Sequence, residues 1–347
     1  MRNPIVRFVF LALVLCASAS PLGAQGRTGI GKYAGEFMAS GLGGRALAMG
    51  GAYVAVANDV TGAYWNPASL MRMQYPEIGL MYEQRFGGLL NYNYGGVAWP
   101  FGTRNTLALT VTRSAVDDMD NTTNALIDLN GNGVIDDGER LDKSKITKFN
   151  NADWAMYMTY AFRGSDRLNL GVNLKLIMRT LADESAYGVG FDIGAQYAVT
   201  PQFFIGANLQ DVTTTLIAWS TGTNDLVSPT AKIGAAYAFE VPGGTLMPAV
   251  DFDLMGENRQ YASTAHVGPV SINPRVGLEY QFRNLFAIRG GFSDTQNFTV
   301  GAGVHLPKLF LDYAYGQSPF SSEIRDASHR ISLRISLEEK KFFRSAK

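Results

Sequence analysis

The sequence has little of what soluble enzymes, nucleic-acid-binding proteins and disulfide-rich domains contain. One cysteine in 347 residues excludes a disulfide framework and any zinc site built from cysteines. Charged residues make up only 17%, and 30 basic side chains balance 30 acidic ones. A basic surface for nucleic acid is therefore not expected. Beyond the first 24 residues the chain also lacks an apolar run of the ~20 residues that a membrane helix needs. If the chain crosses a membrane, it must do so as a closed β-barrel.

The first 24 residues have the features of a secretory signal peptide. Two arginines precede an apolar stretch, and Leu22-Gly23-Ala24 is a suitable cleavage site, with Ala17-Ser18-Ala19 as a second candidate. The alternative is a lipoprotein anchored at Cys16, which Leu15 disfavours because a lipobox has a small residue there. We therefore expect residues 1–24 to direct export and to take no part in the fold.

Apolar and polar residues alternate with a period of two from about Pro76 onward, which predicts β-strands. In one clear run, 168–179, only Ile177 interrupts the polar side. The expected strands are 77–84, 92–101, 105–113, 152–163, 167–179, 186–199, 202–211, 229–240, 244–255, 273–282, 284–292, 297–306, 308–316 and 328–338. Short turns alternate with longer polar connections, as in outer-membrane barrels.

The sequence thus predicts an all-β protein, a 14-stranded antiparallel transmembrane β-barrel over residues 76–338. Its outward apolar side chains would contact outer-membrane lipid, and its polar side chains and glycines would face the lumen. A soluble, secreted β-sandwich also alternates and is the alternative. Glycines and opposite charges on the polar side favour a crowded lumen instead.

Residues 25–75 do not alternate and are rich in glycine, so we expect this segment to fill the lumen as a plug. Asn66-Pro67 favours a turn, and Pro67 can begin a short helix through Ala68. The alternative is a periplasmic arm or a disordered leader. After the barrel, residues 339–347 form a charged segment that we expect on the periplasmic side.

Two stretches of the plug resemble the N-terminal signature of the PorV/PorQ family within the FadL-like group of outer-membrane barrels. They are 44–59, GRALAMGGAYVAVAND, and 64–70, YWNPASL. Residues 312–316 and 328–333 resemble that family's last two strands. Asn66, Pro67 and Ala68 match the hatch motif that FadL-like proteins share.

The resemblance implies a component of the type IX secretion apparatus, with secreted cargo proteins or secretion-complex subunits as partners. The outer loops, chiefly 114–151 and 212–228, and the plug would then be the working parts. The alternative is a FadL-like passive transporter of hydrophobic small molecules, and a purely structural barrel is a third reading. Apolar residues of the second loop, Leu216, Ile217 and Trp219, suit a protein contact or an apolar entrance equally. No catalytic constellation is found, so we do not expect an enzyme.

The sharpest local motif lies in the first of these loops. Residues 128–139 fit the calcium-loop pattern D-x-[DN]-x-[DN]-G-x5-E at every fixed position. Their oxygen donors suit Ca²⁺ in a structural role, and the flanking helices of a true EF-hand are not expected. The alternative is a turn cluster that matches by chance. The expected ligands are Asp128, Asn130, Asn132, Val134 through its carbonyl, Asp136 and Glu139.

Overall fold

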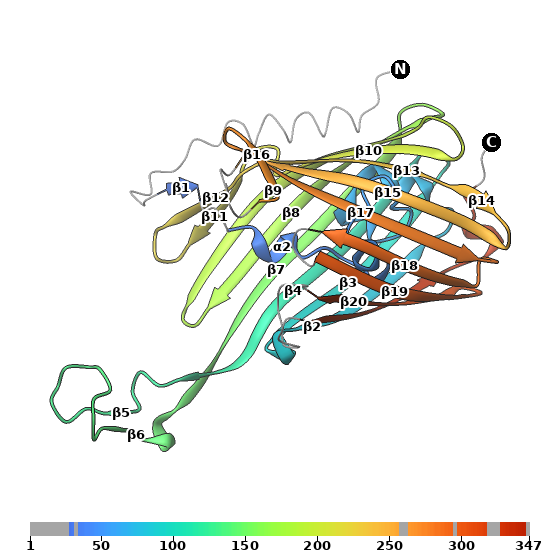
Figure 1. The fold of residues 1–347 in the computed structure, drawn as a ribbon. Coiled ribbons are helices and arrows are strands. Elements are labelled where there is room, and N and C mark those ends of the chain that lie inside the picture. The colour runs from blue at the N-terminus through green and yellow to red at the C-terminus, as the bar shows by residue number, and fades with distance from the viewer. Residues whose placement is uncertain (1–27, 31–33, 257–262, 294–296, 318–326, 345–347) are drawn as a thin grey trace.

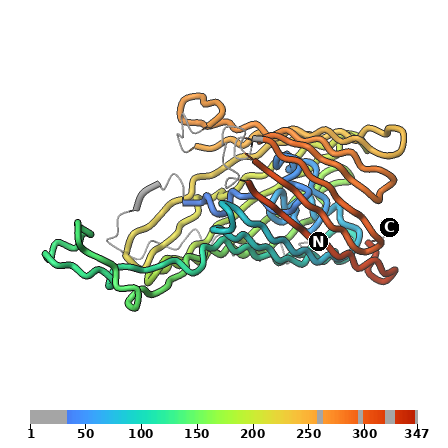
Figure 2. Tube along the Cα trace, turned by 60° about the horizontal axis from the view of Figure 1, so that its bottom comes forward, coloured from blue at the N-terminus to red at the C-terminus, as the bar shows by residue number. Residues whose placement is uncertain are grey.

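The computed structural model describes residues 28–30, 34–256, 263–293, 297–317 and 327–344. Within this part of the chain, fourteen antiparallel strands close into a barrel, as predicted (Figures 1 and 2). The first strand, β2, pairs with both β3 and the last strand, β21, so the sheet has no free edge there. The barrel strands are β2 (Glu77–Arg85), β3 (Leu90–Phe101), β4 (Asn105–Asn121), β7 (Thr147–Arg163), β8 (Leu168–Leu181), β9 (Glu184–Ala198), β10 (Phe203–Gln210), β13 (Thr230–Tyr237), β15 (Gly244–Met255), β17 (Val270–Phe282), β18 (Phe286–Ser293), β19 (Asn297–Leu306), β20 (Leu309–Gln317) and β21 (Ser328–Ser336).

The alternation in the sequence sets which side of each strand faces outward. On β9, Tyr187 is 63% exposed on the outer wall, whereas Gly188 next to it faces inward and is buried. The same pattern places Ile288 of β18 outside and Arg289 inside. A continuous apolar outer wall and a polar inner wall follow from this period of two.

The two ends of the barrel differ. Short turns, residues 73–76 and residues 337–344 lie at one end, which we call the turn end. The long connections lie at the other, which we call the loop end. Here β4 and β7, of 17 residues each, extend beyond their neighbours as an arm (Figures 1 and 2). The arm ends in β5 (Leu126–Ile127), β6 (Arg140–Leu141) and the 3-10 helix η3 (Lys143–Lys145).

The seventh strand of the barrel, β10, is interrupted near the loop end. After β10 the chain turns through Asp211 and Thr214, both with positive φ, and continues as β11 (Thr215–Trp219). Both β10 and β11 pair with β9. β12 (Asn224–Val227) returns along β11 and pairs in parallel with β1 (Thr28–Ile30). The segment expected as loop 212–228 is therefore largely strand. β14 (Phe239–Val241) and β16 (Ala265–Val267) complete the sheet.

Residues 34–73 lie inside the barrel, as Figure 2 shows for the blue segment. They form the short helices α2 (Glu36–Ala39), α3 (Gly44–Ala48) and α4 (Gly62–Trp65) and the 3-10 helix η1 (Pro67–Arg72). We call residues 34–73 the plug. Two further 3-10 helices, η2 (Phe86–Gly88) and η6 (Lys340–Phe342), lie outside it. In the described residues, no helix is long and apolar enough to cross a membrane. The expected signal peptide, 1–24, falls outside them.

Candidate functional site

Glycines of the barrel wall let the backbone of the plug lie directly against it. A Cβ atom on Gly206 would lie 2.5 Å from the carbonyl oxygen of Val54, and one on Gly277 would lie 2.5 Å from that of Met49. Real Cβ atoms do not approach oxygen that closely, so a larger residue at either position would displace the plug. The glycines on the inner wall thus make room for the plug.

The predicted plug motif joins the plug to the wall. The Asn66 amide donates to the carbonyl oxygens of Val54 in the plug and Ala195 in β9, both at 3.0 Å. Its side-chain oxygen accepts from the Ala68 N–H at 3.2 Å, which caps η1 at its start. Pro67 occupies the first position of η1, where the helix needs no N–H. One fully buried asparagine therefore satisfies three backbone groups.

Wall side chains also satisfy backbone groups in the middle of the plug. The Asp251 carboxylate accepts from the N–H groups of Tyr53 and Val54 at 2.6 and 2.8 Å. The Gln196 amide donates to the Ala55 carbonyl oxygen at 2.9 Å. Because buried backbone groups need partners, these contacts fix the plug without regular secondary structure.

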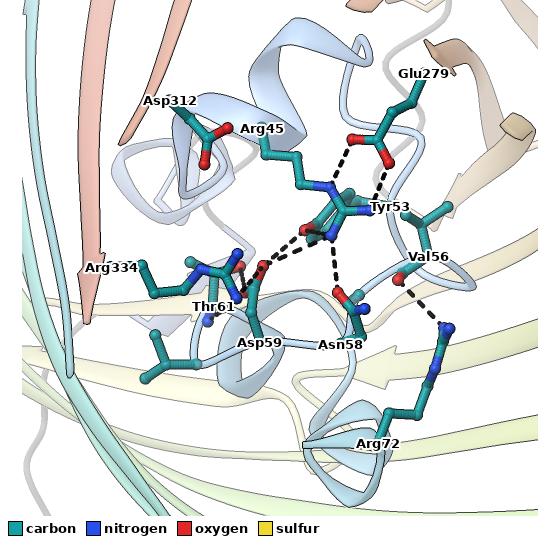
Figure 3. Close-up of polar contacts among 12 residues, drawn as sticks. Arg45, Tyr53, Val56, Asn58, Asp59, Thr61, Arg72, Glu279, Asp312 and Arg334 are labelled. Carbon is teal, nitrogen blue, oxygen red and sulfur yellow. Dashed lines mark hydrogen bonds and ion pairs between the residues drawn. The ribbon is translucent and has the colours of Figure 1, made fainter. Parts of the chain in front are cut away.

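A charge network crosses from the plug to the wall (Figure 3). Arg45 of α3 makes two hydrogen bonds to the carboxylate of Glu279 on β17, at 2.7 and 2.8 Å. The same guanidinium donates to Asn58 at 2.7 Å and to the Tyr53 hydroxyl at 3.2 Å. That hydroxyl donates to Asp59 at 2.8 Å. The lumen is therefore charged but internally neutralised.

Arg334 and Arg289 extend this network along the wall. Arg334 bonds Glu77 at 3.1 Å and lies 3.9 Å from Asp59. Burial alone would raise the pKa of Asp59, but Arg334 and Arg45 hold it below its ordinary value. Arg289 bonds Glu279 at 2.6 Å. Glu77, Asp59 and Glu279 of the lumen thus each lie beside an arginine.

A second set of ion pairs lies nearer the loop end. Lys175 bonds Asp192 at 2.8 Å and also bonds Asp211. Arg275 bonds Asp253 at 2.8 Å, and Lys232 lies 3.8 Å from the same carboxylate. Lys175, Asp211, Lys232, Asp253 and Arg275 of these pairs line a cavity of about 50 Å³ between α2 and the barrel wall. A polar cavity of this size has room for water but not for a larger ligand.

Apolar side chains lie next to this cavity, and Met38 and Val227 line it. Ile177 and Ile217 point inward, are buried, and belong with these two residues to one apolar cluster. Ile177 is the residue that interrupts the polar side of its strand. Sequence reasoning treated the inner wall as polar throughout and missed this cluster, although the interruption was visible.

Two aromatic rings frame the same cluster. Phe37 and Trp219 pack against it, and the Arg179 guanidinium lies over both rings, 5.1 and 5.3 Å from their centres. Of the three apolar residues noted in 212–228, Trp219 and Ile217 thus face the lumen, whereas Leu216 is exposed on the outer wall. We call Phe37, Met38, Ile177, Ile217 and Trp219 the apolar mouth.

The expected calcium loop lies at the tip of the arm, between β5 and β6. The Asp128 carboxylate accepts from several backbone N–H groups, including that of Gly133 at 2.8 Å. These hydrogen bonds lower the pKa of Asp128 below its ordinary value. Glu139 folds back to accept from the Leu129 N–H at 2.8 Å, so the first and last ligand positions lie close. Asp136 accepts from the amides of the two expected asparagine ligands. Across the described ranges, no group of three His, Cys, Asp or Glu side chains is placed to hold a metal.

Comparison with solved structures decides the fold. The CymD monoaromatic hydrocarbon channel matches with a TM-score of 0.57 and 13% identity, over 86% of this chain and 98% of that one. The Ralstonia pickettii toluene transporter TbuX matches with a TM-score of 0.55 and 13% identity, over 85% and 98%. The P. putida toluene transporter TodX matches with a TM-score of 0.54 and 10% identity, over 86% and 99%. The chain has the FadL-like barrel fold. No family model and no curated protein matches its sequence.

These FadL-like neighbours correct the preferred functional interpretation. The resemblance to PorV/PorQ implied handling of cargo in a type IX secretion pathway, but the similar structures are transporters and channels for small hydrocarbons. The secretion role is therefore wrong, and the alternative of hydrophobic small-molecule transport is better supported. The barrel and its neighbours indicate an outer-membrane protein, and the neighbours are not enzymes.

Proposed function

We propose that this FadL-like barrel lets small hydrophobic molecules cross the outer membrane without chemical change. The observation that carries the proposal is the fold, which extends over nearly the whole length of three hydrocarbon transporters and channels. The apolar mouth supplies what a hydrophobic molecule needs at the outer end of an otherwise charged lumen. Because the plug fills the space behind it, passage along the lumen requires the plug to shift.

Uptake by cells tests this proposal. Cells that express the protein should accumulate a labelled monoaromatic hydrocarbon faster than cells without it, when the concentration is limiting. Changing Trp219 to Ala removes a large apolar surface from the mouth, so we expect uptake to fall several-fold. Tyr187→Ala on the outer wall is the matched control, because β9 places this ring toward lipid. Equal uptake with and without the protein would overturn the proposal.

We also propose that the arm binds one Ca²⁺ through residues 128–139. The complete motif supports this, as does the approach of Glu139 to the start of the loop. Binding would require the asparagine amides to turn their oxygens inward, in place of the N–H groups that now face Asp136. The ion would stiffen an exposed tip that has little packing of its own.

We further propose how the chain reaches the outer membrane and what surrounds it there. Residues 1–24 direct export, and outer-membrane lipid covers the apolar wall. The likeness of residues 44–59 and 64–70 to the PorV/PorQ signature falls on residues that pack inside the barrel. It carries no secretion role here.

A further inference from the structure

Residues 340–344 fold back across the turn end of the barrel. The ring of Phe342 packs edge-on against Trp99 of β3, with ring centres 5.1 Å apart. Phe343 packs against Tyr75, just after the plug, at 5.3 Å. This segment was expected only as a charged periplasmic tail, yet it contacts the junction between plug and barrel.

Arg344 enters that junction and is 6% exposed. Its backbone N–H donates to the Gln74 carbonyl oxygen, and its guanidinium donates to the Met71 carbonyl oxygen, both at 2.9 Å. The other side of the guanidinium donates to Thr106 and to the Asn105 carbonyl oxygen at the start of β4. Since Met71 belongs to η1, one side chain ties the end of the plug to the wall.

This contact differs from those that hold the middle of the plug. Arg45 is held by a carboxylate, whereas the described partners of the Arg344 guanidinium are all neutral. Its Nε is buried and has no hydrogen-bond partner among the described residues. Burial lowers the pKa of Arg344 to about 10, and Arg163 adds to the effect. A buried cation without a counter-ion is a weaker attachment than a buried ion pair with good geometry.

We propose that Arg344 is a latch that positions η1 in the turn end and releases it when the plug moves. The ion pairs of Arg45 with Glu279 and of Arg334 with Asp59 hold the centre of the plug, so the latched end is the part that can detach first. The inference rests on the proposed transport function, which gives the plug a reason to move. That Arg344 holds η1 against the wall follows from the contacts alone.

Thiol labelling of η1 tests the latch without any cargo. Ser69 is fully buried in η1, and its hydroxyl has no hydrogen-bond partner among the described residues, so Ser69→Cys is a mild change. In a Cys16→Ser background this reporter is the only thiol. With Arg344→Ala, a membrane-impermeant maleimide should label it about tenfold faster, since two or more hydrogen bonds to a charged group are lost. Arg344→Lys should give an intermediate rate.

Lys341→Ala is the matched control. It removes a positive charge from the same segment, but Lys341 is exposed and pairs with Glu339 at 3.1 Å. Its labelling rate should equal that of the unchanged protein. An Arg344→Ala rate equal to that of Lys341→Ala would overturn the latch. Heat-dependent mobility in gels verifies that each barrel is folded.

A reversible lock provides the second measurement, which keeps Arg344 in place. Tyr75→Cys with Phe343→Cys places one thiol on each side of this ring contact, where a bifunctional methanethiosulfonate reagent can join them. Cross-linking should slow labelling of η1, read at position 69 by peptide mass spectrometry, and uptake of a monoaromatic hydrocarbon, and a reductant that cleaves the cross-link should restore both. Unchanged labelling in the locked protein would contradict the latch. If the lock and Arg344→Ala alter labelling but the unchanged protein takes up no hydrocarbon, the latch stands and the transport function fails.

Discussion

At the scale of single residues, side chains of the wall and the plug substitute for regular secondary structure inside the lumen. Asn66 binds two carbonyl groups and caps η1, and Asp251 accepts from two successive N–H groups. The plug needs this because its helices are only one or two turns long. The NPA motif could be recognised from sequence, but its partner Ala195 could not, because 129 residues separate them.

Asn66→Ala should loosen the plug while the barrel remains closed. The change leaves buried carbonyl groups without a donor, at about 1–3 kcal/mol each, and removes a helix cap worth about 1 kcal/mol. We expect a lower temperature of heat-dependent gel mobility change and faster proteolysis within residues 34–73. Asn124→Ala, at an exposed position of the arm, is the control. If both variants unfold at the same temperature, the Asn66 contacts do not hold the plug.

At the scale of elements, the barrel strands could be predicted and the parts outside the membrane could not. Two-residue alternation is a local signal, so it located every barrel strand. It ended β4 at residue 113 and began β7 at 152, whereas the strands continue to Asn121 and from Thr147. Beyond the membrane both faces of the hairpin are wet, so the alternation is lost. The apolar mouth was missed because its residues come from separate strands and from the plug.

The tip of the arm, residues 128–139, should respond to Ca²⁺. If residues 128–139 bind Ca²⁺, the ion should protect the tip from proteolysis, and Asp128→Ala with Glu139→Ala should abolish that protection. Thr122→Ala with Thr123→Ala, at exposed positions outside the loop, should not. Identical cleavage of the unchanged arm with Ca²⁺ and with a chelator would rule the site out.

At the scale of the whole molecule, buried charge holds two separately formed parts together. Glu279 of the wall is shared by Arg45 of the plug and Arg289 of the neighbouring strand. Composition could predict that lumen charges balance, because an unpaired charge is costly away from water. It could not predict that one carboxylate would serve two cations on different parts of the fold.

Glu279→Gln should therefore destabilise the whole barrel more than a surface change of the same kind. Removing one partner of a buried ion pair costs about 3–5 kcal/mol, because the other charge stays buried. The control is Asp117→Asn, which breaks the part-exposed pair with Arg113 and should cost about 0–1 kcal/mol. Urea unfolding, monitored by tryptophan fluorescence, gives the free energy of unfolding of both variants. A loss of this free energy in Glu279→Gln no larger than in the control would show that the network does not stabilise the fold.

The pairing of β2 with β21 also constrains how the protein is made. These strands meet with Glu77 opposite Ser336, so the ring cannot shut until almost the whole chain has been translated and delivered. The plug precedes every wall strand in the chain, and its backbone contacts even the last strand, β21, where the Gly44 N–H donates to Ser332. The plug must therefore already lie against the wall strands when β2 pairs with β21. Assembly becomes a single late event between distant segments, which is slow in folding generally and leaves the unclosed edges open to aggregation until then.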